Sequence, residues 1–193
     1  MNSDAESSHK VVMLGSSSVG KTSIVLQLHE KVFKRMVTPT VGSGVIMEEI
    51  STHKGIVQLR IWDTAGEERY RTFTGLYSRS ASAGIIVFDI TEPSSFESLN
   101  SWIREFKNNA LENAPLYLVG NKIDLVDQRM VSNEEAKNFA IQNGLKYFEV
   151  SAKTGENVEL LFTDLATELG PKIMPIDELA PVISTPRDSG CNC

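Results

Sequence analysis

Short apolar runs and helix-like stretches alternate along most of the chain. Six apolar runs predict strands, at residues 11–14, 45–51, 56–63, 85–88, 116–119 and 147–150. Stretches whose apolar residues recur every three or four positions predict helices, at residues 22–31, 96–109, 132–143 and 158–169. This alternation indicates an α/β fold with a mostly parallel six-stranded sheet and helices on both faces. Ligands of such folds bind at the carboxyl ends of the strands.

The two ends of the chain lack this pattern. Residues 1–9 are polar and predict a flexible arm, so the folded domain is expected over 10–170. Residues 171–193 hold four prolines and no apolar periodicity, which predicts a flexible tail. The longest apolar runs are too short to span a bilayer, and residues 1–6 lack the pattern of a signal peptide.

Composition narrows the function. Of 193 residues, 41% are hydrophobic and 23% are charged, as in one globular domain. The net charge of −6 argues against a broad nucleic-acid or anionic-lipid surface, but leaves room for a local phosphate site. The two cysteines, Cys191 and Cys193, form no disulfide framework and indicate a cytosolic protein.

A phosphate-binding loop follows the first predicted strand. The pattern G-x-x-x-x-G-K-[ST] is matched by Gly15, Ser16, Ser17, Ser18, Val19, Gly20, Lys21 and Thr22, and we include Ser23 in the site. Backbone amides and the following helix N-terminus bind phosphate oxygens in such loops. Lys21 would reach the β- and γ-phosphates, and the Thr22 hydroxyl would bind Mg²⁺.

A second motif, Asp63-Thr64-Ala65-Gly66, ends the third predicted strand. The Asp63 carboxylate can hold Mg²⁺ through water, and the Gly66 amide can contact a γ-phosphate. Alone, the pattern D-x-x-G equally fits an ordinary glycine turn. Its position downstream of a phosphate-binding loop favours the functional interpretation.

A third motif, Asn121-Lys122-Ile123-Asp124, follows the fifth predicted strand. The Asp124 carboxylate can accept two hydrogen bonds, from N1–H and the exocyclic amine of guanine. Adenine has no such donor pair, so this residue selects the base. Asn121 and Lys122 would support the pocket and stack on the ring.

A fourth motif, Ser151-Ala152-Lys153, follows the last predicted strand, where a backbone amide can donate to guanine O6. Either of these two motifs alone could be a surface turn. Four motifs, each placed directly after a strand, are not expected by accident.

Together these motifs resemble those of the small GTPase superfamily, a P-loop NTPase fold with a Ras-like G domain. Residues 62–72 and 88–91, together with the ending Cys191-Asn192-Cys193, are most similar to the Rab family. The resemblance implies a GTP/GDP-cycling switch that regulates vesicle traffic, with GTP, GDP and Mg²⁺ as ligands. It further implies a monomer, without nucleic-acid partners, in the cytosol and on the cytoplasmic face of intracellular membranes.

The resemblance also assigns roles. Thr40 matches the threonine that binds Mg²⁺ and senses the γ-phosphate, and Phe33 matches the aromatic residue at the guanine edge, although an apolar anchor at the helix end is the alternative. Switch I would span 34–44 and switch II 66–79. Exchange factors, GTPase-activating proteins, a GDP-dissociation inhibitor or escort protein, and effectors would bind these switches.

The catalytic set implied by the resemblance is Lys21, Thr40, Gly66 and Glu67. Glu67 stands where the family usually has the Gln that orients the attacking water. An ionised Glu accepts but cannot donate a hydrogen bond, so it either slows hydrolysis or assists the water as a base. We expect slow but real turnover. The alternatives are a non-hydrolysing or constitutively GTP-loaded binding module, and an ATP-using enzyme that Asp124 argues against.

Two further features concern membranes and effectors. Cys191 and Cys193 resemble the Rab C-x-C ending, where both thiols carry geranylgeranyl groups; free thiols are the alternative. Residues 171–193 lack a polybasic patch, so two lipids would be needed for stable anchoring. Val45 stands where Rab proteins usually have Phe, which reduces the effector patch expected with Trp62 and Tyr77.

Overall fold

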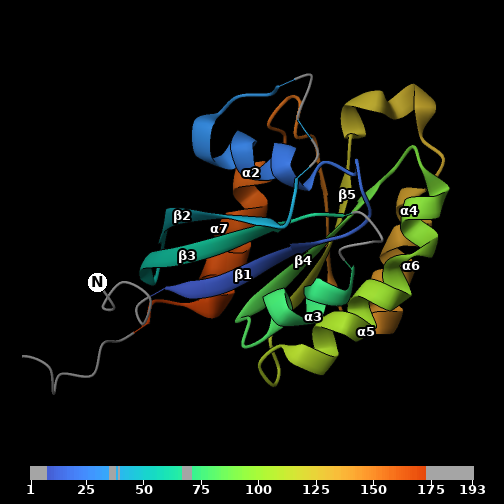
Figure 1. Cartoon of the computed structure of the whole chain (residues 1–193). Coiled ribbons are helices and arrows are strands. Elements are labelled where there is room, and N and C mark those ends of the chain that lie inside the picture. Colours follow the sequence, from blue (N-terminus) through green and yellow to red (C-terminus); the bar gives the residue numbers. More distant parts are fainter. Residues whose placement is uncertain (1–7, 35–37, 39, 67–70, 173–193) are drawn as a thin grey trace, which may run out of the picture.

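The computed structural model of the chain describes residues 8–34, 38, 40–66 and 71–172, and for residues 71–74 the backbone only. Within these residues the chain forms a single six-stranded sheet with the strand order β2-β3-β1-β4-β5-β6 (Figure 1). The strands are β1 (His9–Leu14), β2 (Ser43–Thr52), β3 (Gly55–Thr64), β4 (Ala83–Asp89), β5 (Leu116–Asn121) and β6 (Lys146–Val150). Only β2 runs antiparallel to its neighbour, which confirms the mostly parallel sheet.

Helices cover both faces of the sheet, as predicted (Figure 1). One face carries α2 (Lys21–Glu30) and α7 (Val158–Leu169), and the other carries α3 (Arg71–Ser78), α4 (Pro93–Glu97), α5 (Leu99–Asn109) and α6 (Asn133–Asn143). A short 3-10 helix, η2 (Ile123–Gln128), follows β5. No helix in the described part of the chain is long and apolar enough to cross a membrane.

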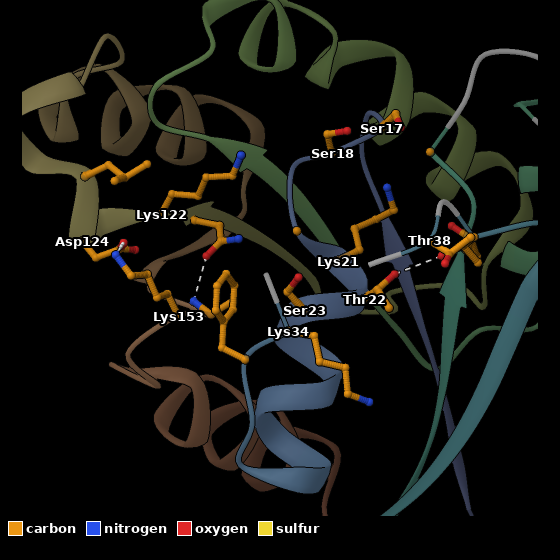
Figure 2. Close-up of a pocket in the computed structure, with 18 residues that line it drawn as sticks. Ser17, Ser18, Lys21, Thr22, Ser23, Lys34, Thr38, Lys122, Asp124 and Lys153 are labelled. Carbon is orange, nitrogen blue, oxygen red and sulfur yellow. Dashed lines mark hydrogen bonds and ion pairs between the residues drawn. The ribbon is translucent and has the colours of Figure 1, made fainter. Parts of the chain in front are cut away.

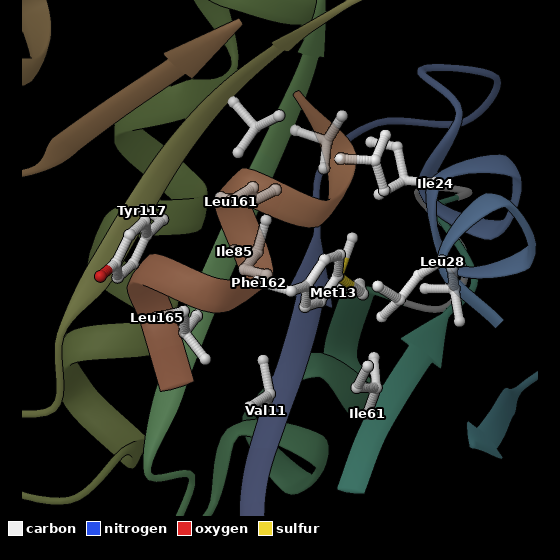
Figure 3. Packing of buried hydrophobic residues seen from close by; sticks show 14 of the residues in the cluster. Val11, Met13, Ile24, Leu28, Ile61, Ile85, Tyr117, Leu161, Phe162 and Leu165 are labelled. Carbon is white, nitrogen blue, oxygen red and sulfur yellow. The ribbon is translucent and has the colours of Figure 1, made fainter. Parts of the chain in front are cut away.

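The core is divided between the two faces because side chains alternate along β1. Val11 and Met13 pack in the cluster with α2 and α7, whereas Val12 and Leu14 pack on the other side. Figure 3 shows Phe162 of α7 lying against Met13. Every residue of β4 is buried, as its unbroken apolar run predicts for a central strand.

The observed element boundaries differ from the prediction at several places. The single helix expected over 96–109 is divided at Ser98 into α4 and α5. The Ser98 hydroxyl donates to the Ser95 carbonyl at 2.9 Å, and the Ser101 hydroxyl donates to the Ser98 carbonyl at 2.5 Å. These bonds compete with helical hydrogen bonds at the division. In addition, β1 begins at His9, two residues before the strand predicted at 11–14.

Candidate functional site

A cavity of about 370 Å³ lies at the carboxyl ends of the strands, where the four motifs meet (Figure 2). The predicted site residues that line it are Ser17, Ser18, Gly20, Lys21, Thr22, Ser23, Phe33, Thr40, Gly66, Asn121, Lys122, Asp124, Ala152 and Lys153. Gly15, Ser16, Val19, Asp63 and Ser151 do not line the cavity, but each contacts a residue that does. Glu67, Cys191 and Cys193 lie outside the described residues.

Lys21 occupies the phosphate end of the cavity and is only 5% exposed. Its amine donates to the carbonyls of Gly15 at 2.8 Å and Ser16 at 2.7 Å, so the loop folds around it. Burial lowers the pKa of Lys21 to about 8, although the nearby Asp63 carboxylate opposes the shift. Phosphate oxygens beside this amine would favour its charged form again.

Two glycines let the phosphate-binding loop approach its neighbours. Gly20 has φ 99°, and a Cβ added there would lie 2.2 Å from the Asn121 amide nitrogen. A Cβ on Gly66 would lie 2.4 Å from the backbone carbonyl oxygen of Ser16 and 2.3 Å from the Lys21 amine. Both positions therefore require glycine for close packing around the cavity.

Three oxygen-bearing side chains meet beside this end of the cavity. The Thr22 hydroxyl donates to Asp63 Oδ2 at 2.7 Å and lies 3.0 Å from the Thr40 hydroxyl. Asp63 Oδ1 is buried and has no hydrogen-bond partner among the described residues. Burial raises the pKa of Asp63, although Thr22 and the Lys21 charge oppose the shift. Hydroxyl and carboxylate oxygens fit Mg²⁺, and a cation would satisfy Oδ1 and keep the carboxylate ionised.

Asp124 lies at the opposite end of the cavity (Figure 2). The Ser151 hydroxyl donates a hydrogen bond to Asp124 Oδ1 at 2.7 Å, and the Lys153 amine lies 3.2 Å from Asp124 Oδ2. Partial burial favours protonation, but the hydrogen bonds from Ser151 and Lys153 outweigh it and lower the pKa of Asp124. The side chain is thus an ionised acceptor held in one orientation, as recognition of guanine donors requires.

Asn121 links the two ends and is almost fully buried. Its Nδ2 donates to the Val19 carbonyl of the phosphate-binding loop at 2.8 Å. Its Oδ1 accepts a hydrogen bond from the Ala152 amide at 3.0 Å. One side chain therefore fixes the spacing between the phosphate loop and the two base-binding loops.

Phe33 lines the cavity and is 41% exposed. An apolar anchor at the helix end would be buried, so this position favours contact with the guanine edge. Four further lining residues were not predicted as individual site residues: Lys34, Thr38, Thr64 and Leu125. Lys34 and Thr38 fall within the expected switch I, and Thr64 belongs to the second motif, although none was given a role of its own. Leu125 has a common apolar side chain that carries no chemical signature in the sequence.

Comparison with known proteins agrees with this site. The sequence model of the Ras family matches residues 10–170. The chain is 39% identical to the Ras-related protein RABF2b of Arabidopsis thaliana, over 87% of the chain and 84% of the relative. It is 39% identical to the Ras-related protein Rab-5A of Dictyostelium discoideum, over 83% of the chain and 80% of the relative.

The chain belongs to the Rab family of small GTPases. As a Rab-family protein it is a small GTPase of vesicle traffic, and its reaction is hydrolysis of GTP. The family implies guanine nucleotides, regulators and effectors as partners.

The three residues of the expected apolar patch of this Rab-family chain come from β2, β3 and α3. Val45 is 46% exposed and lies opposite Trp62 in the β2–β3 register. The rings of Trp62 and Tyr77 are 6.0 Å apart, and the Lys10 amine lies 4.7 Å from the centre of the Trp62 ring. With Val instead of an aromatic side chain, the patch offers two aromatic rings rather than three.

Proposed function

We propose that this Rab-family chain cycles between GTP and GDP states by means of the cavity described above. The observation that carries the proposal is the placement of a buried lysine amine and an oriented carboxylate at opposite ends of one cavity. The lysine end suits phosphates, and the carboxylate end suits the donor edge of guanine. Asn121 holds the two ends at a fixed spacing.

Mg²⁺ would be held by Thr22, Thr40 and Asp63, and when bound it would neutralise charge on the β- and γ-phosphates. The chain's own groups then have separate tasks. Lys21 holds phosphate oxygens, the Gly66 amide donates to the γ-phosphate, and Thr40 ties switch I to the phosphate end. Loss of the γ-phosphate would release the contacts of Thr40 and Gly66, and the two switches would change conformation for regulators and effectors.

Hydrolysis in this proposal is slow because Glu67 replaces the water-orienting Gln. An ionised carboxylate cannot donate a hydrogen bond, and its charge repels the γ-phosphate. Membership in a family of GTPases favours turnover over a module that only holds GTP. Single-turnover hydrolysis of the wild type, Glu67→Gln and Glu67→Leu tests this. Turnover between those of the two variants is expected, and a wild type as inactive as Glu67→Leu, with an activating protein present, would refute it.

The nucleotide that copurifies with the protein tests the proposal as a whole. GDP is expected for a cycling hydrolase, and GTP would indicate stalled turnover. ATP would contradict guanine selection by Asp124.

Membrane attachment in this proposal uses two geranylgeranyl groups, on Cys191 and Cys193, after delivery by an escort protein. The protein would then act on the cytoplasmic face of intracellular membranes. Detergent phase partitioning of the native protein and of a Cys191→Ser/Cys193→Ser variant tests the anchor. The native protein should enter the detergent phase and the variant should stay in the aqueous phase, whereas equal partitioning would exclude lipidation.

A further inference from the structure

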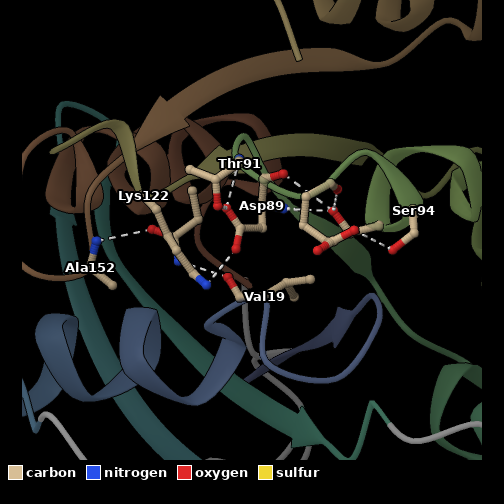
Figure 4. Close-up of polar contacts among 9 residues, drawn as sticks. Val19, Asp89, Thr91, Ser94, Lys122 and Ala152 are labelled. Atoms are coloured by element: carbon tan, nitrogen blue, oxygen red, sulfur yellow. Dashed lines mark hydrogen bonds and ion pairs between the residues drawn. The ribbon is translucent and has the colours of Figure 1, made fainter. Parts of the chain in front are cut away.

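Asp89, the last residue of β4, does not line the cavity but lies next to Lys122, which does (Figure 4). Its side chain is only 7% exposed. Its Oδ1 accepts hydrogen bonds from the Thr91 amide at 2.9 Å and the Thr91 hydroxyl at 2.7 Å. Its Oδ2 pairs with the Lys122 amine. This buried carboxylate is thus fully engaged, and one of its partners is a cavity residue.

Lys122 is held at both of its ends. Its backbone has φ 72°, a left-handed conformation that is uncommon for residues other than glycine. Its amine pairs with Asp89, so the alkyl stem of this cavity-lining residue is restrained at both ends. A lysine without such a partner loses conformational freedom when a ligand orders it, and prior ordering removes that cost from binding.

The backbone joins the same two segments. Asp89 is the register partner of Asn121, the residue before Lys122, and the Ile90 amide donates to the Asn121 carbonyl at 3.2 Å. The end of β4 and the base-binding loop therefore form one rigid unit. The side-chain pair extends this unit from the backbone to the surface that a base would contact.

We propose that Asp89 is a positioning residue for nucleotide retention, acting through Lys122. It holds the Lys122 stem flat against the face of the purine ring, and the inference rests on the proposed guanine site. Asp124 recognises the edge of the base, whereas the Asp89–Lys122 pair supports its face. The pair is therefore expected to set how long a nucleotide stays bound, and not which base is chosen.

Asp89→Asn tests the proposal most directly, because the amide keeps an oxygen for Thr91 and loses the charge that holds Lys122. GDP release, measured by stopped-flow with a fluorescent GDP, should become about tenfold faster, the effect of weakening one charge-assisted hydrogen bond. Glu92→Gln is the matched control, because Glu92 is exposed and its carboxylate accepts a hydrogen bond from Ser94. An unchanged release rate in Asp89→Asn would overturn the proposal.

A double-variant cycle separates positioning from general support of the fold. Lys122→Met keeps an unbranched stem and removes the amine. If Asp89 acts through that amine, adding Asp89→Asn to Lys122→Met should leave the GDP release rate nearly unchanged. If the two effects multiply instead, Asp89 acts independently of Lys122 and the proposal fails.

Inosine diphosphate, which lacks the exocyclic amine of guanine, distinguishes support of the face of the base from recognition of its edge. Asp89→Asn should accelerate release of GDP and inosine diphosphate by the same factor. A changed ratio between them would assign Asp89 to base choice and overturn the proposal. Failure of the wild type to bind GDP would instead refute the guanine site itself, so the two failures are distinguishable.

Discussion

Asp124→Asn is the sharpest test of base recognition, because it changes one atom of an oriented side chain. Asp124 presents an ionised carboxylate whose Oδ1 and Oδ2 are held by Ser151 and Lys153. In the variant, the amide oxygen keeps the Ser151 bond and the amide nitrogen replaces Oδ2. Guanine then meets one neutral acceptor and one donor in place of two charged acceptors.

The expected loss follows from the two hydrogen bonds. Each bond to a charged group contributes about 1.5–3 kcal/mol, so the pair contributes about 3–6 kcal/mol. At about 1.4 kcal/mol per factor of ten, the GDP dissociation constant should rise by about 10²- to 10⁴-fold. The Asp124 side chain is only 11% exposed, so screening by solvent weakens these two hydrogen bonds only slightly. Xanthine carries a carbonyl in place of the exocyclic amine, and the new amide should donate to it.

The assay compares the dissociation constants of GDP, xanthosine diphosphate and ADP, each obtained from association and dissociation rates. Asp127→Asn is the matched control, since Asp127 is exposed, lies three residues away and does not line the cavity. Preference for xanthosine diphosphate over GDP is expected only in Asp124→Asn. Unchanged GDP affinity in that variant would refute base recognition by Asp124.

The remaining predictions concern the backbone, the cation and pH. Gly20→Ala should release GDP at least tenfold faster, because it combines the strain of φ 99° with a Cβ 2.2 Å from the Asn121 amide nitrogen. Gly144→Ala, at φ 67° with open space around it, isolates the strain and should leave release unchanged. Chelation of Mg²⁺ should accelerate GDP release in the wild type but not in Asp63→Ala, as stopped-flow would show. Burial favours the protonated form of Glu149, but the ion pair with Arg129 outweighs it and lowers the pKa of Glu149. The stabilisation that this ion pair gives the fold is therefore present above the usual pKa of about 4.3 and is lost as pH falls through the lowered pKa. Urea unfolding should therefore show Glu149→Gln less stable than the wild type at neutral pH and nearly equal to it in strong acid.

The sequence alone predicts the sheet, and the topology of a parallel sheet explains why it also predicts that the four motifs meet. Residues that directly follow parallel strands meet at one edge, so Lys21 and Asp124 share a cavity despite their separation in the chain. The division of a helix at Ser98 was not predicted, because serine hydroxyl bonding depends on local rotamers. The role of Asp89 was equally hidden, because its partner Lys122 is distant in sequence and the pairing appears only when β4 and β5 align.

The two ends of the cavity differ in what they need from a ligand. At the base end, Asp124 and Asn121 have their partners within the protein, so this surface is built before a nucleotide arrives. At the phosphate end, burial disfavours the charge of Lys21 and leaves Asp63 Oδ1 without a partner among the described residues. Phosphate and Mg²⁺ would satisfy both groups, so binding of Mg²⁺ and nucleotide should stabilise the fold mainly through this end. An exchange factor that disturbs the phosphate end would then remove most of this stabilisation, whereas the internal hydrogen bonds of Asp124 and Asn121 support the base-binding loops.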